Sequence, residues 1–392
     1  MALSRRSFIT AVGAGSVSAF TAPLIHARGL EASRGLAPVL QGIDERKADR
    51  RLAAQPGMIR IDSNENPVGP GEKALAAIRA ALDASNRYPV LGEDDVKEAI
   101  AKIQGVPADL VMLGCGSGEI LRSAVQAFTS KDRGYVAPAP TFEAPGNYAK
   151  FIGSPVVDVP VDAKLAADLD ALASAARGAG LVYLCNPNNP TATAHTKADV
   201  TAFIKAVNAA SPDTTILVDE AYFEYVDLPG YGTVIPLALQ NPRVIVARTF
   251  SKVYGMAGLR LGYAIGTKET LAKMAGVQLG SNTNQLVLSA AAASLADPAH
   301  IAAEVKRNEE VRAFTRKFFA GLGLKMSAGQ ANFMMVDVGR EAKAFKAACL
   351  AQKVAIGRPF PPLTNQARLS FGTMPEMQKA VEVFRAVLAQ RP

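Results

Sequence analysis

Three absences narrow the possible classes of protein for this sequence of 392 residues. The three cysteines, Cys115, Cys185 and Cys349, are too few for a disulfide framework, and we expect them to be small buried residues rather than reactive thiols. The formal net charge is +8, but the basic residues form no block, so nucleic acid is not an expected partner. After the N-terminal segment, no stretch is long and apolar enough to span a membrane. With 49% hydrophobic and 20% charged residues, the chain is typical of a globular protein with one large and one smaller domain.

The N-terminal segment is predicted to be an export signal. Arg5 and Arg6 precede a mildly apolar stretch that ends near Phe20, and this pattern resembles a twin-arginine (Tat) signal. The stretch is too short for a stable transmembrane helix. The alternative is a fortuitous arginine pair before a disordered tail. We therefore expect a signal peptide over residues 1–27, an arm over residues 28–57 and a periplasmic or secreted protein, which would be cytoplasmic if the signal were absent.

Short apolar runs alternate with amphipathic helices from about residue 85 to residue 285. This alternation predicts an α/β fold with a mostly parallel sheet flanked by helices, in which ligands bind beyond the carboxyl ends of the strands. Residues 286–392 begin with a long charged helix and predict a smaller C-terminal α+β domain, to which residues 58–84 are expected to contribute. The predicted strands are 111–113, 135–137, 181–184, 216–218, 244–247 and 263–265 in the large domain, and 333–336 and 367–371 in the smaller one.

Chemically useful side chains follow three of these predicted strands. Lys252 comes after residues 244–247, Asp219 after residues 216–218, and Asn189 after residues 181–184. A lysine can bond an aldehyde, and a strand-end carboxylate can pair with a protonated ring nitrogen, as pyridoxal phosphate requires. The alternative for Asp219 is an ordinary strand-end residue that caps a turn. A solvated surface lysine is the alternative for Lys252, but it fits poorly after a buried strand.

A glycine-rich turn is the candidate binding site for the cofactor phosphate. Gly116, Ser117 and Gly118 join a strand to a helix, where glycine lets the backbone approach an anion and the helix N-terminus offers N–H groups. Alone, the glycines indicate no more than a tight turn. Thr249 and Arg260 strengthen the prediction because they add a hydroxyl and a guanidinium at fixed offsets from Lys252.

Three residues are candidates for contact with the cofactor ring. Asn189 and Tyr222 could donate hydrogen bonds to its phenolic oxygen. Phe142 could stack on the ring face, or it could be an ordinary core aromatic. Lys252, Asp219 and Tyr222 are the predicted catalytic residues.

As an ordered set, these residues resemble the aspartate-aminotransferase superfamily, fold type I of the pyridoxal phosphate enzymes. Within it, the sequence is similar to the histidinol-phosphate aminotransferase family over nearly all of the chain from about Met58. The motifs are specific for fold and cofactor and less specific for substrate. They are Ser63–Pro67, Asn86–Pro89, Asn186–Thr191, Asp219–Tyr222, Thr249–Lys252, Gly258–Gly262 and Arg368–Gly372.

The resemblance implies further roles. Tyr88 would reach the cofactor phosphate of a neighbouring subunit, so a homodimer with shared active sites is expected. Arg368 would hold the substrate α-carboxylate in a bidentate fork, and Arg358 would face the distal end of the substrate. Asn66 is assigned to the substrate and Ser251 to the cofactor, and no metal site is expected.

The sequence departs from the family pattern in two places. Ala192 stands where glycine is usual, and Gly118 stands where the phosphate loop usually has an acidic residue, but neither change removes a catalytic group. The resemblance implies an aminotransferase that uses a small amino donor and a 2-oxo acid acceptor. Because histidine biosynthesis is cytosolic, the predicted export favours a different donor.

Two other hypotheses remain at this point. An amino-acid oxidase, decarboxylase or lyase would use the same cofactor and the same surrounding residues. A catalytically silent binding protein on this fold is disfavoured because both Lys252 and Asp219 are retained.

Overall fold

The computed structural model describes residue 51, residues 55–89 and residues 92–390. Two compact units divide the chain, residues 1–56 and residues 57–392, and the second contains all elements discussed below. The predicted signal peptide, residues 1–27, lies outside the described residues, as do residues 28–50 and 52–54 of the predicted arm. No single helix among the described residues is long and apolar enough to cross a membrane; helices α11 (Gln285–Leu295) and α12 (Pro298–Gly321) meet that criterion only as a pair bent by 83°.

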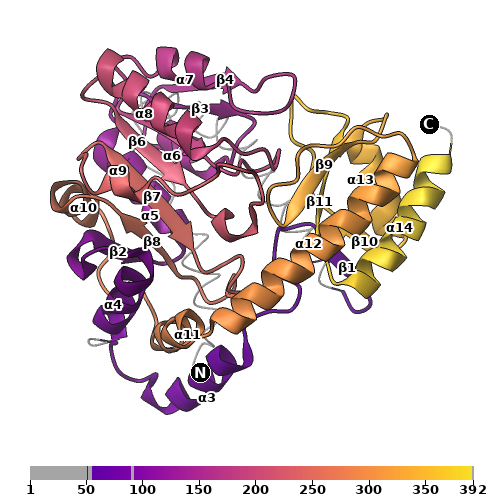
Figure 1. Ribbon diagram of the computed structural model, residues 1–392, viewed down its shortest axis with the longest axis horizontal. Helices are drawn as coiled ribbons and strands as arrows, with labels where there is room; N and C mark the ends of the chain where they lie inside the picture. Colours follow the sequence, from indigo (N-terminus) through magenta and orange to yellow (C-terminus); the bar gives the residue numbers. More distant parts are fainter. Residues whose placement is uncertain (1–50, 52–54, 90–91, 391–392) are drawn as a thin grey trace, which may run out of the picture. The chain divides into compact units, whose positions relative to one another are not determined.

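A seven-stranded sheet is the framework of the larger part of this unit (Figure 1). Its strands are β2 (Val111–Gly114), β3 (Tyr135–Ala139), β4 (Val156–Pro160), β5 (Leu181–Cys185), β6 (Thr215–Asp219), β7 (Val244–Thr249) and β8 (Gly262–Ile265). The spatial order is β2-β8-β7-β6-β5-β3-β4. Neighbouring strands from β7 to β4 run parallel, whereas β8 is antiparallel to both β7 and β2. The predicted α/β fold with a mostly parallel sheet is confirmed.

Helices bury both faces of this sheet. They are α4 (Gly92–Gln104), α5 (Ser117–Phe128), α6 (Ala144–Phe151), α7 (Leu169–Ala175), α8 (Lys197–Ala210), α9 (Ile235–Ala238) and α10 (Lys268–Ala275). Successive side chains of a strand point to opposite faces, so Tyr183 packs in a core with Leu121 of α5, while Leu184 packs in another core with Phe203 of α8. Burial on both faces explains why these strands appear in the sequence as continuous apolar runs.

The C-terminal part contains two small sheets with a separate core. Strands β1 (Ile59–Ile61) and β10 (Val354–Ile356) pair in parallel, and β9 (Phe333–Asp337) and β11 (Gln366–Ser370) pair antiparallel. Helices α12, α13 (Ala342–Ala351) and α14 (Met374–Ala389) pack beside them (Figure 1). Phe384 stacks on Phe319 with ring centroids 5.7 Å apart and lies 5.9 Å from Phe345. These aromatic contacts join the three helices into one core.

The segment before residue 85 is divided between the two cores. Ile61 of β1 is buried in the C-terminal core, whereas Ala74 of α3 (Glu72–Ala81) belongs to the core of the large sheet together with Val287 of α11. The predicted boundaries at 84/85 and 285/286 stay predictions. The remaining short 3-10 helices are η1 (Leu82–Ala84), η2 (Ala108–Leu110) and η3 (Phe223–Tyr225).

Capping boxes mark the start of two helices. The Thr196 side chain accepts a hydrogen bond from the N–H of Asp199, and the Asp199 side chain accepts one from the N–H of Thr196, which completes a capping box at the start of α8. Thr373 and Glu376 form the same arrangement at the start of α14. Such reciprocal bonds satisfy N–H groups that have no partner within the helix, and so they fix where each helix begins.

Candidate active site

The predicted reactive residues meet at one edge of the large sheet. Strand β6 ends at Asp219, which is in register with Cys185 at the end of β5 and with Ala247 of β7. Asn189 and Lys252 follow β5 and β7 closely in the chain. Because β5, β6 and β7 run parallel, their carboxyl ends lie together, and this is the edge at which sheets of this kind bind ligands.

Asp219 is a buried carboxylate whose two oxygens are both held. The hydroxyl of Tyr183 donates to Oδ2 at 2.8 Å, and the N–H of Ala221 donates to Oδ1 at 3.1 Å. Burial raises the pKa of Asp219 to about 6, while these two hydrogen bonds and the charge of Lys252 oppose the increase. The carboxylate is therefore mostly ionised at neutral pH and can pair with a cation brought to it.

Lys252 carries an amine that is unusually easy to deprotonate. Its Nζ donates to the backbone oxygen of Asn64 at 2.9 Å and lies 5.4 Å from the ring centroid of Tyr222. Burial, and then the positive charge of Arg368, lowers the pKa of Lys252 to about 8. Most of this amine is still protonated at physiological pH, but the neutral, nucleophilic form is far more abundant than in an ordinary lysine.

Asn64 joins several of these groups, although sequence reasoning did not single it out. It is 1% exposed, and its φ of 54° lies in the left-handed region. Its Nδ2 donates to the Tyr222 hydroxyl at 3.2 Å, and its Oδ1 accepts from the Ser370 hydroxyl at 3.0 Å. The motif Ser63–Pro67 contained the signal, but spacing alone does not tell which of its two asparagines faces the site.

Asn66, the asparagine chosen from the sequence, is bonded to the backbone. Its Nδ2 donates to the oxygen of Val253 at 3.1 Å, and its Oδ1 accepts from the N–H of Val68 at 3.0 Å. These bonds hold the loop that contains Asn64 against the segment after Lys252. A role of Asn66 in substrate binding stays a prediction.

The antiparallel direction of β8 brings Arg260 to the same edge of the sheet. Because β8 starts where β7 and β2 end, Gly262 is in register with both Thr249 and Gly114. Nη1 of Arg260 lies 3.5 Å from the hydroxyl of Ser251, and the hydroxyl of Thr249 donates to the same oxygen at 3.0 Å. A guanidinium and two hydroxyls thus lie together beside Lys252.

The turn between β2 and α5 fits closely against Arg260. Gly116 has a φ of 72°, and a β-carbon at this position would overlap Nη2 of Arg260. A β-carbon on Gly262 would overlap the backbone nitrogen of Ser117. The N-terminus of α5 and the guanidinium therefore face one small region, which favours a phosphate dianion.

Gly118 and Cys115 lie on either side of Gly116 in this segment. A β-carbon on Gly118 would meet nothing within 4 Å, so crowding does not explain the missing acidic residue. The expectation of buried cysteines is correct for Cys185 and Cys349 and wrong for Cys115, which is exposed because it lies in the loop after β2. The N–H of Cys115 donates to Oε2 of Glu119 at 2.6 Å, and so does Nδ2 of Asn282 at the same distance.

Arg368 of β11 reaches the site from the C-terminal part. It is 8% exposed; its Nη1 donates to Oδ1 of Asn189 at 2.8 Å, and its Nη2 donates to the backbone oxygen of Asp62 at 2.7 Å. Its Nε is buried without a hydrogen-bond partner. Burial lowers the pKa of Arg368 to about 10. A buried guanidinium with a donor to spare is suited to receive a carboxylate.

Phe142 and Arg358 lie at the outer side of this region. Phe142 follows β3 and is 36% exposed, so the alternative of an ordinary core aromatic is not supported. Arg358 follows β10, and its Nη2 lies 2.6 Å from Oε2 of Glu143, the residue after Phe142. Glu143 was not among the residues predicted from the sequence.

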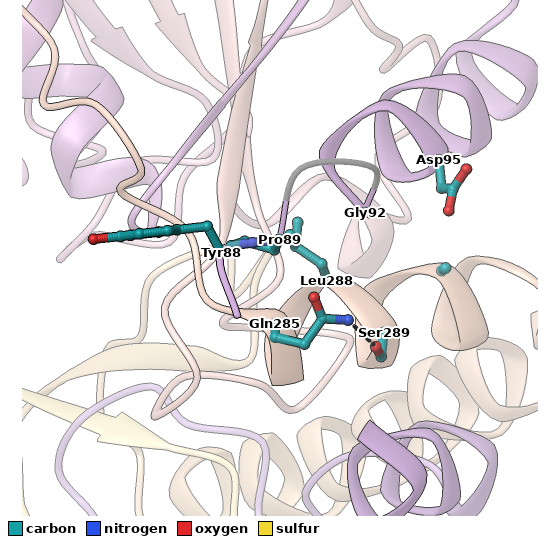
Figure 2. A pocket seen from close by; sticks show the side chains of 8 residues that line it. Tyr88, Pro89, Gly92, Asp95, Gln285, Leu288 and Ser289 are labelled. Atoms are coloured by element: carbon teal, nitrogen blue, oxygen red, sulfur yellow. Dashed lines mark hydrogen bonds between the residues drawn. The ribbon is translucent and has the colours of Figure 1, made fainter. Parts of the chain in front are cut away.

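Tyr88 lies in an exposed segment before α4. It is 80% exposed and lines a hollow together with side chains of α4 and α11. Figure 2 shows its ring directed away from Gln285 and Asp95, which line the same hollow. The phenol is therefore accessible to a second molecule.

The residues brought together here fit pyridoxal phosphate. Arg260, Thr249 and Ser251 and the turn before α5 match its phosphate, Asp219 matches its ring nitrogen, and Lys252 matches its aldehyde. No group of three or more His, Cys, Asp or Glu side chains within the described ranges is placed to hold a metal ion. This set of groups at the carboxyl edge of a mostly parallel sheet defines a fold type I enzyme.

The chain belongs to the aminotransferase class I and II family, whose model matches residues 56–384. The histidinol-phosphate aminotransferase of Symbiobacterium thermophilum is 35% identical over 362 residues, which cover 92% of this chain and 98% of the relative. The aromatic amino acid aminotransferase of Rhodococcus jostii is 34% identical over 339 residues, which cover 84% of this chain and 93% of the relative. The crystal structure of histidinol-phosphate aminotransferase from Sinorhizobium meliloti in complex with pyridoxal-5'-phosphate matches with a TM-score of 0.79 and 27% identity, over 87% of this chain and 94% of that chain. The predicted family is therefore confirmed.

Replacing Tyr183 by Phe should weaken cofactor binding in a pH-dependent way. Tyr183 is a buried residue of β5, not predicted from the sequence, whose hydroxyl stabilises the ionised form of Asp219. Without it the pKa of Asp219 should rise above about 6. On lowering the pH, the carboxylate would then become protonated, and lose its charge, at a higher pH than in the wild type. We expect affinity for added pyridoxal phosphate to fall roughly threefold to tenfold at neutral pH.

Titration of cofactor-free protein between about pH 5 and about pH 8 would measure this shift. Tyr135→Phe is the matched control, because the hydroxyl of Tyr135 is also buried but has no hydrogen-bond partner. If Tyr183→Phe and wild type gave superimposable pH profiles, the hydrogen bond to Asp219 would have no electrostatic role.

Proposed function

We propose that this protein is a pyridoxal phosphate-dependent aminotransferase. It moves an amino group from an α-amino acid, or from an amine like histidinol phosphate, to a 2-oxo acid. The observation that carries the proposal is the convergence of Lys252, Asp219 and Arg260 at one sheet edge in a member of aminotransferase class I and II. The bound cofactor would supply an electron sink for the substrate α-carbon once its proton is removed.

The surrounding residues are suited to hold and orient the cofactor ring. The Asp219 carboxylate would keep the ring nitrogen protonated. The Tyr222 hydroxyl accepts a hydrogen bond from Asn64 and so keeps its own proton to donate. Asn189 uses Oδ1 to accept from Arg368, which leaves its Nδ2 as a donor. Both donors suit the phenolic oxygen of the ring.

Lys252 is suited to act as the acid–base group once the substrate amine has replaced it. Its lowered pKa of about 8 gives a neutral Nζ that can accept the α-proton. With the cofactor bound, the protonated Nζ would then serve as the acid that gives this proton up again. Amino transfer requires that the proton is not given back to the α-carbon. Water would then release the first 2-oxo acid, and the reverse sequence on the acceptor 2-oxo acid would complete the transfer.

Arg368→Ala should depress turnover of all carboxylate-bearing donors to a similar degree. The guanidinium is buried and has an unsatisfied Nε, and a bidentate charge-assisted contact with the α-carboxylate contributes a few kcal/mol. We expect kcat/KM to fall roughly 10²-fold or more for each α-amino acid. Donors without a carboxylate, such as histidinol phosphate, should lose less. A uniform loss that includes such donors would indicate that Arg368 supports the fold rather than the substrate.

The type of reaction can be separated from its alternatives by its products. An aminotransferase forms one new amino acid from added 2-oxo acid for each donor consumed. Oxygen uptake without an acceptor would instead identify an oxidase, and release of carbon dioxide a decarboxylase. Either result, without new amino acid, would overturn the proposal.

A homodimer with shared sites is part of the proposal. It is supported by the exposure of Tyr88, at 80%, and of Leu279, at 77%, because large exposed side chains of this kind are common at subunit interfaces. Light scattering on the purified protein tests the assembly. A monomer with full activity would exclude shared sites.

Export through the Tat route is the proposed localisation, supported by Arg5 and Arg6 before an apolar stretch. Replacing both arginines by lysine should retain the protein in the cytoplasm with its cofactor bound. Fractionation of cells that produce either form measures the distribution. Equal export of both forms, or retention of the wild type, would show that the arginine pair is not a signal.

A further inference from the structure

We propose that Glu143 is a specificity-determining residue that competes with the distal group of the amino donor for Arg358. The enzyme then favours donors whose distal end carries no negative charge. This inference rests on the proposed aminotransferase function and concerns which donors the same site accepts.

The contact joins two parts of the chain that are far apart in sequence. Glu143 follows Phe142 and is the N-cap residue of α6, beside the large sheet. Arg358 follows β10 in the C-terminal part. Their side chains meet with Nη2 and Oε2 2.6 Å apart. The carboxylate therefore comes from the side of the predicted cofactor-stacking residue, and the guanidinium comes from the side of Arg368.

A shared aromatic ring sets Arg358 beside the carboxylate-binding arginine. The Cζ atom of Arg358 lies 4.1 Å from the centroid of Phe360, and that of Arg368 lies 4.8 Å from the same centroid. Burial and then the charge of Arg358 lower the pKa of Arg368, while the charge of Glu143 opposes them. When Arg368 holds the α-carboxylate of a donor, the donor side chain therefore lies in the electrostatic potential of Arg358 and Glu143.

The ion pair between Arg358 and Glu143 is weak enough for a substrate group to replace Glu143. Nη1 of Arg358 donates to the backbone oxygen of Pro359 at 2.9 Å, and Nη2 is taken by Glu143. The two side chains are 34% and 44% exposed, and ion pairs with this much access to water are weak. An anionic distal group of the donor must displace the Glu143 carboxylate from Arg358, and the negative charge of Glu143 repels that group. An uncharged or basic distal group has no such competitor.

Glu143→Gln tests the proposal because it removes the charge and keeps the shape. The holoenzyme is mixed with donors in the absence of acceptor, and the loss of the bound cofactor's absorbance band is followed. The donors are phenylalanine, arginine and glutamate, whose distal ends are uncharged, positive and negative. We expect the apparent second-order rate constant of this half-reaction to rise roughly fivefold for glutamate relative to phenylalanine. The value for phenylalanine should change less than about twofold.

A binding measurement gives a second readout that requires no turnover. Succinate carries two carboxylates, one for Arg368 and one for Arg358, and its affinity can be measured by calorimetry. Glu143→Gln should tighten it to a similar extent. The control is Glu98→Gln, because Glu98 is exposed on α4 and its replacement changes the net charge equally. This control should leave the donor ranking and the succinate affinity unchanged.

The same substitution in an Arg358→Ala background identifies the mechanism. If Glu143 acts by occupying Arg358, the gain for glutamate and succinate disappears without Arg358. A gain that persists there, or a ranking that Glu143→Gln does not change, would overturn the proposal. If no donor affected the wild-type absorbance band, the aminotransferase function itself would be wrong, and the succinate titration would still decide the competition.

Discussion

Lys252→Ala should abolish turnover, with a fall of at least roughly 10⁴-fold, while the protein stays folded. The loss is large because one amine has two roles: it bonds the cofactor and it moves the substrate proton. Nζ is held by the backbone oxygen of Asn64, so its removal leaves the hydrogen bonds of Tyr222 and Arg368 in place. Steady-state amino-acid formation measures the activity, and the variant should still bind pyridoxal phosphate without a covalent bond.

The control for this experiment is Lys197→Ala. Lys197 is an exposed residue at the start of α8, outside the group of side chains that meet around Lys252, and its loss should leave turnover unchanged. Circular dichroism and cofactor retention would show that both variants are folded. Appreciable turnover by Lys252→Ala would contradict the assignment of this site as the active site.

Asp219→Asn should reduce kcat by about 10³-fold with a smaller effect on KM. Asparagine has nearly the same shape and can keep contacts with Tyr183 and Ala221, but a neutral amide cannot stabilise a protonated ring nitrogen. The proton-removal step should therefore slow far more than substrate binding. Deuterium at the donor α-carbon should give a larger isotope effect on kcat in the variant.

Asp213→Asn is the matched control for Asp219→Asn. The Asp213 side chain is 81% exposed, in the loop before β6, so it carries the same change of charge outside the site. A near-normal kcat for Asp219→Asn would assign Asp219 to structure alone.

Six of the seven strands of the large sheet could be predicted because they are buried on both faces, whereas the edge strand β4 was missed because most of its residues are partly or fully exposed. Val244–Ala247 is apolar at every position, and such runs between amphipathic helices leave few alternatives. The three-residue strands β1 and β10 were not predicted, since a run this short has no period to detect. Their pairing depends on the core around Ile61, which brings together residues distant in sequence.

The chemical groups of the site could also be predicted, because the sequence motifs contain the residue types that directly follow each strand. Lys252, Asp219, Thr249 and Arg260 all lie at the predicted edge. The partners that hold these groups could not be predicted in the same way. In the sequence, Tyr183 is indistinguishable from a core residue. Its hydroxyl can donate to Asp219 only because β5 lies beside β6 in the sheet. Glu143 is likewise one carboxylate among many until α6 and the loop after β10 are seen together.

The direction of β8 has a consequence for transplanting this site into other proteins. A parallel return would require a crossover that carries the chain back to the opposite edge of the sheet before the next strand could begin. Here β8 returns antiparallel after the loop of residues 250–261, so Thr249, Lys252, Arg260 and Gly262 belong to one continuous segment that begins and ends at the same edge. A designer can therefore treat Thr249–Gly262 as a single cassette to insert between two adjacent strands. The host must then supply a glycine turn like that at Gly116 and a carboxylate on the next strand.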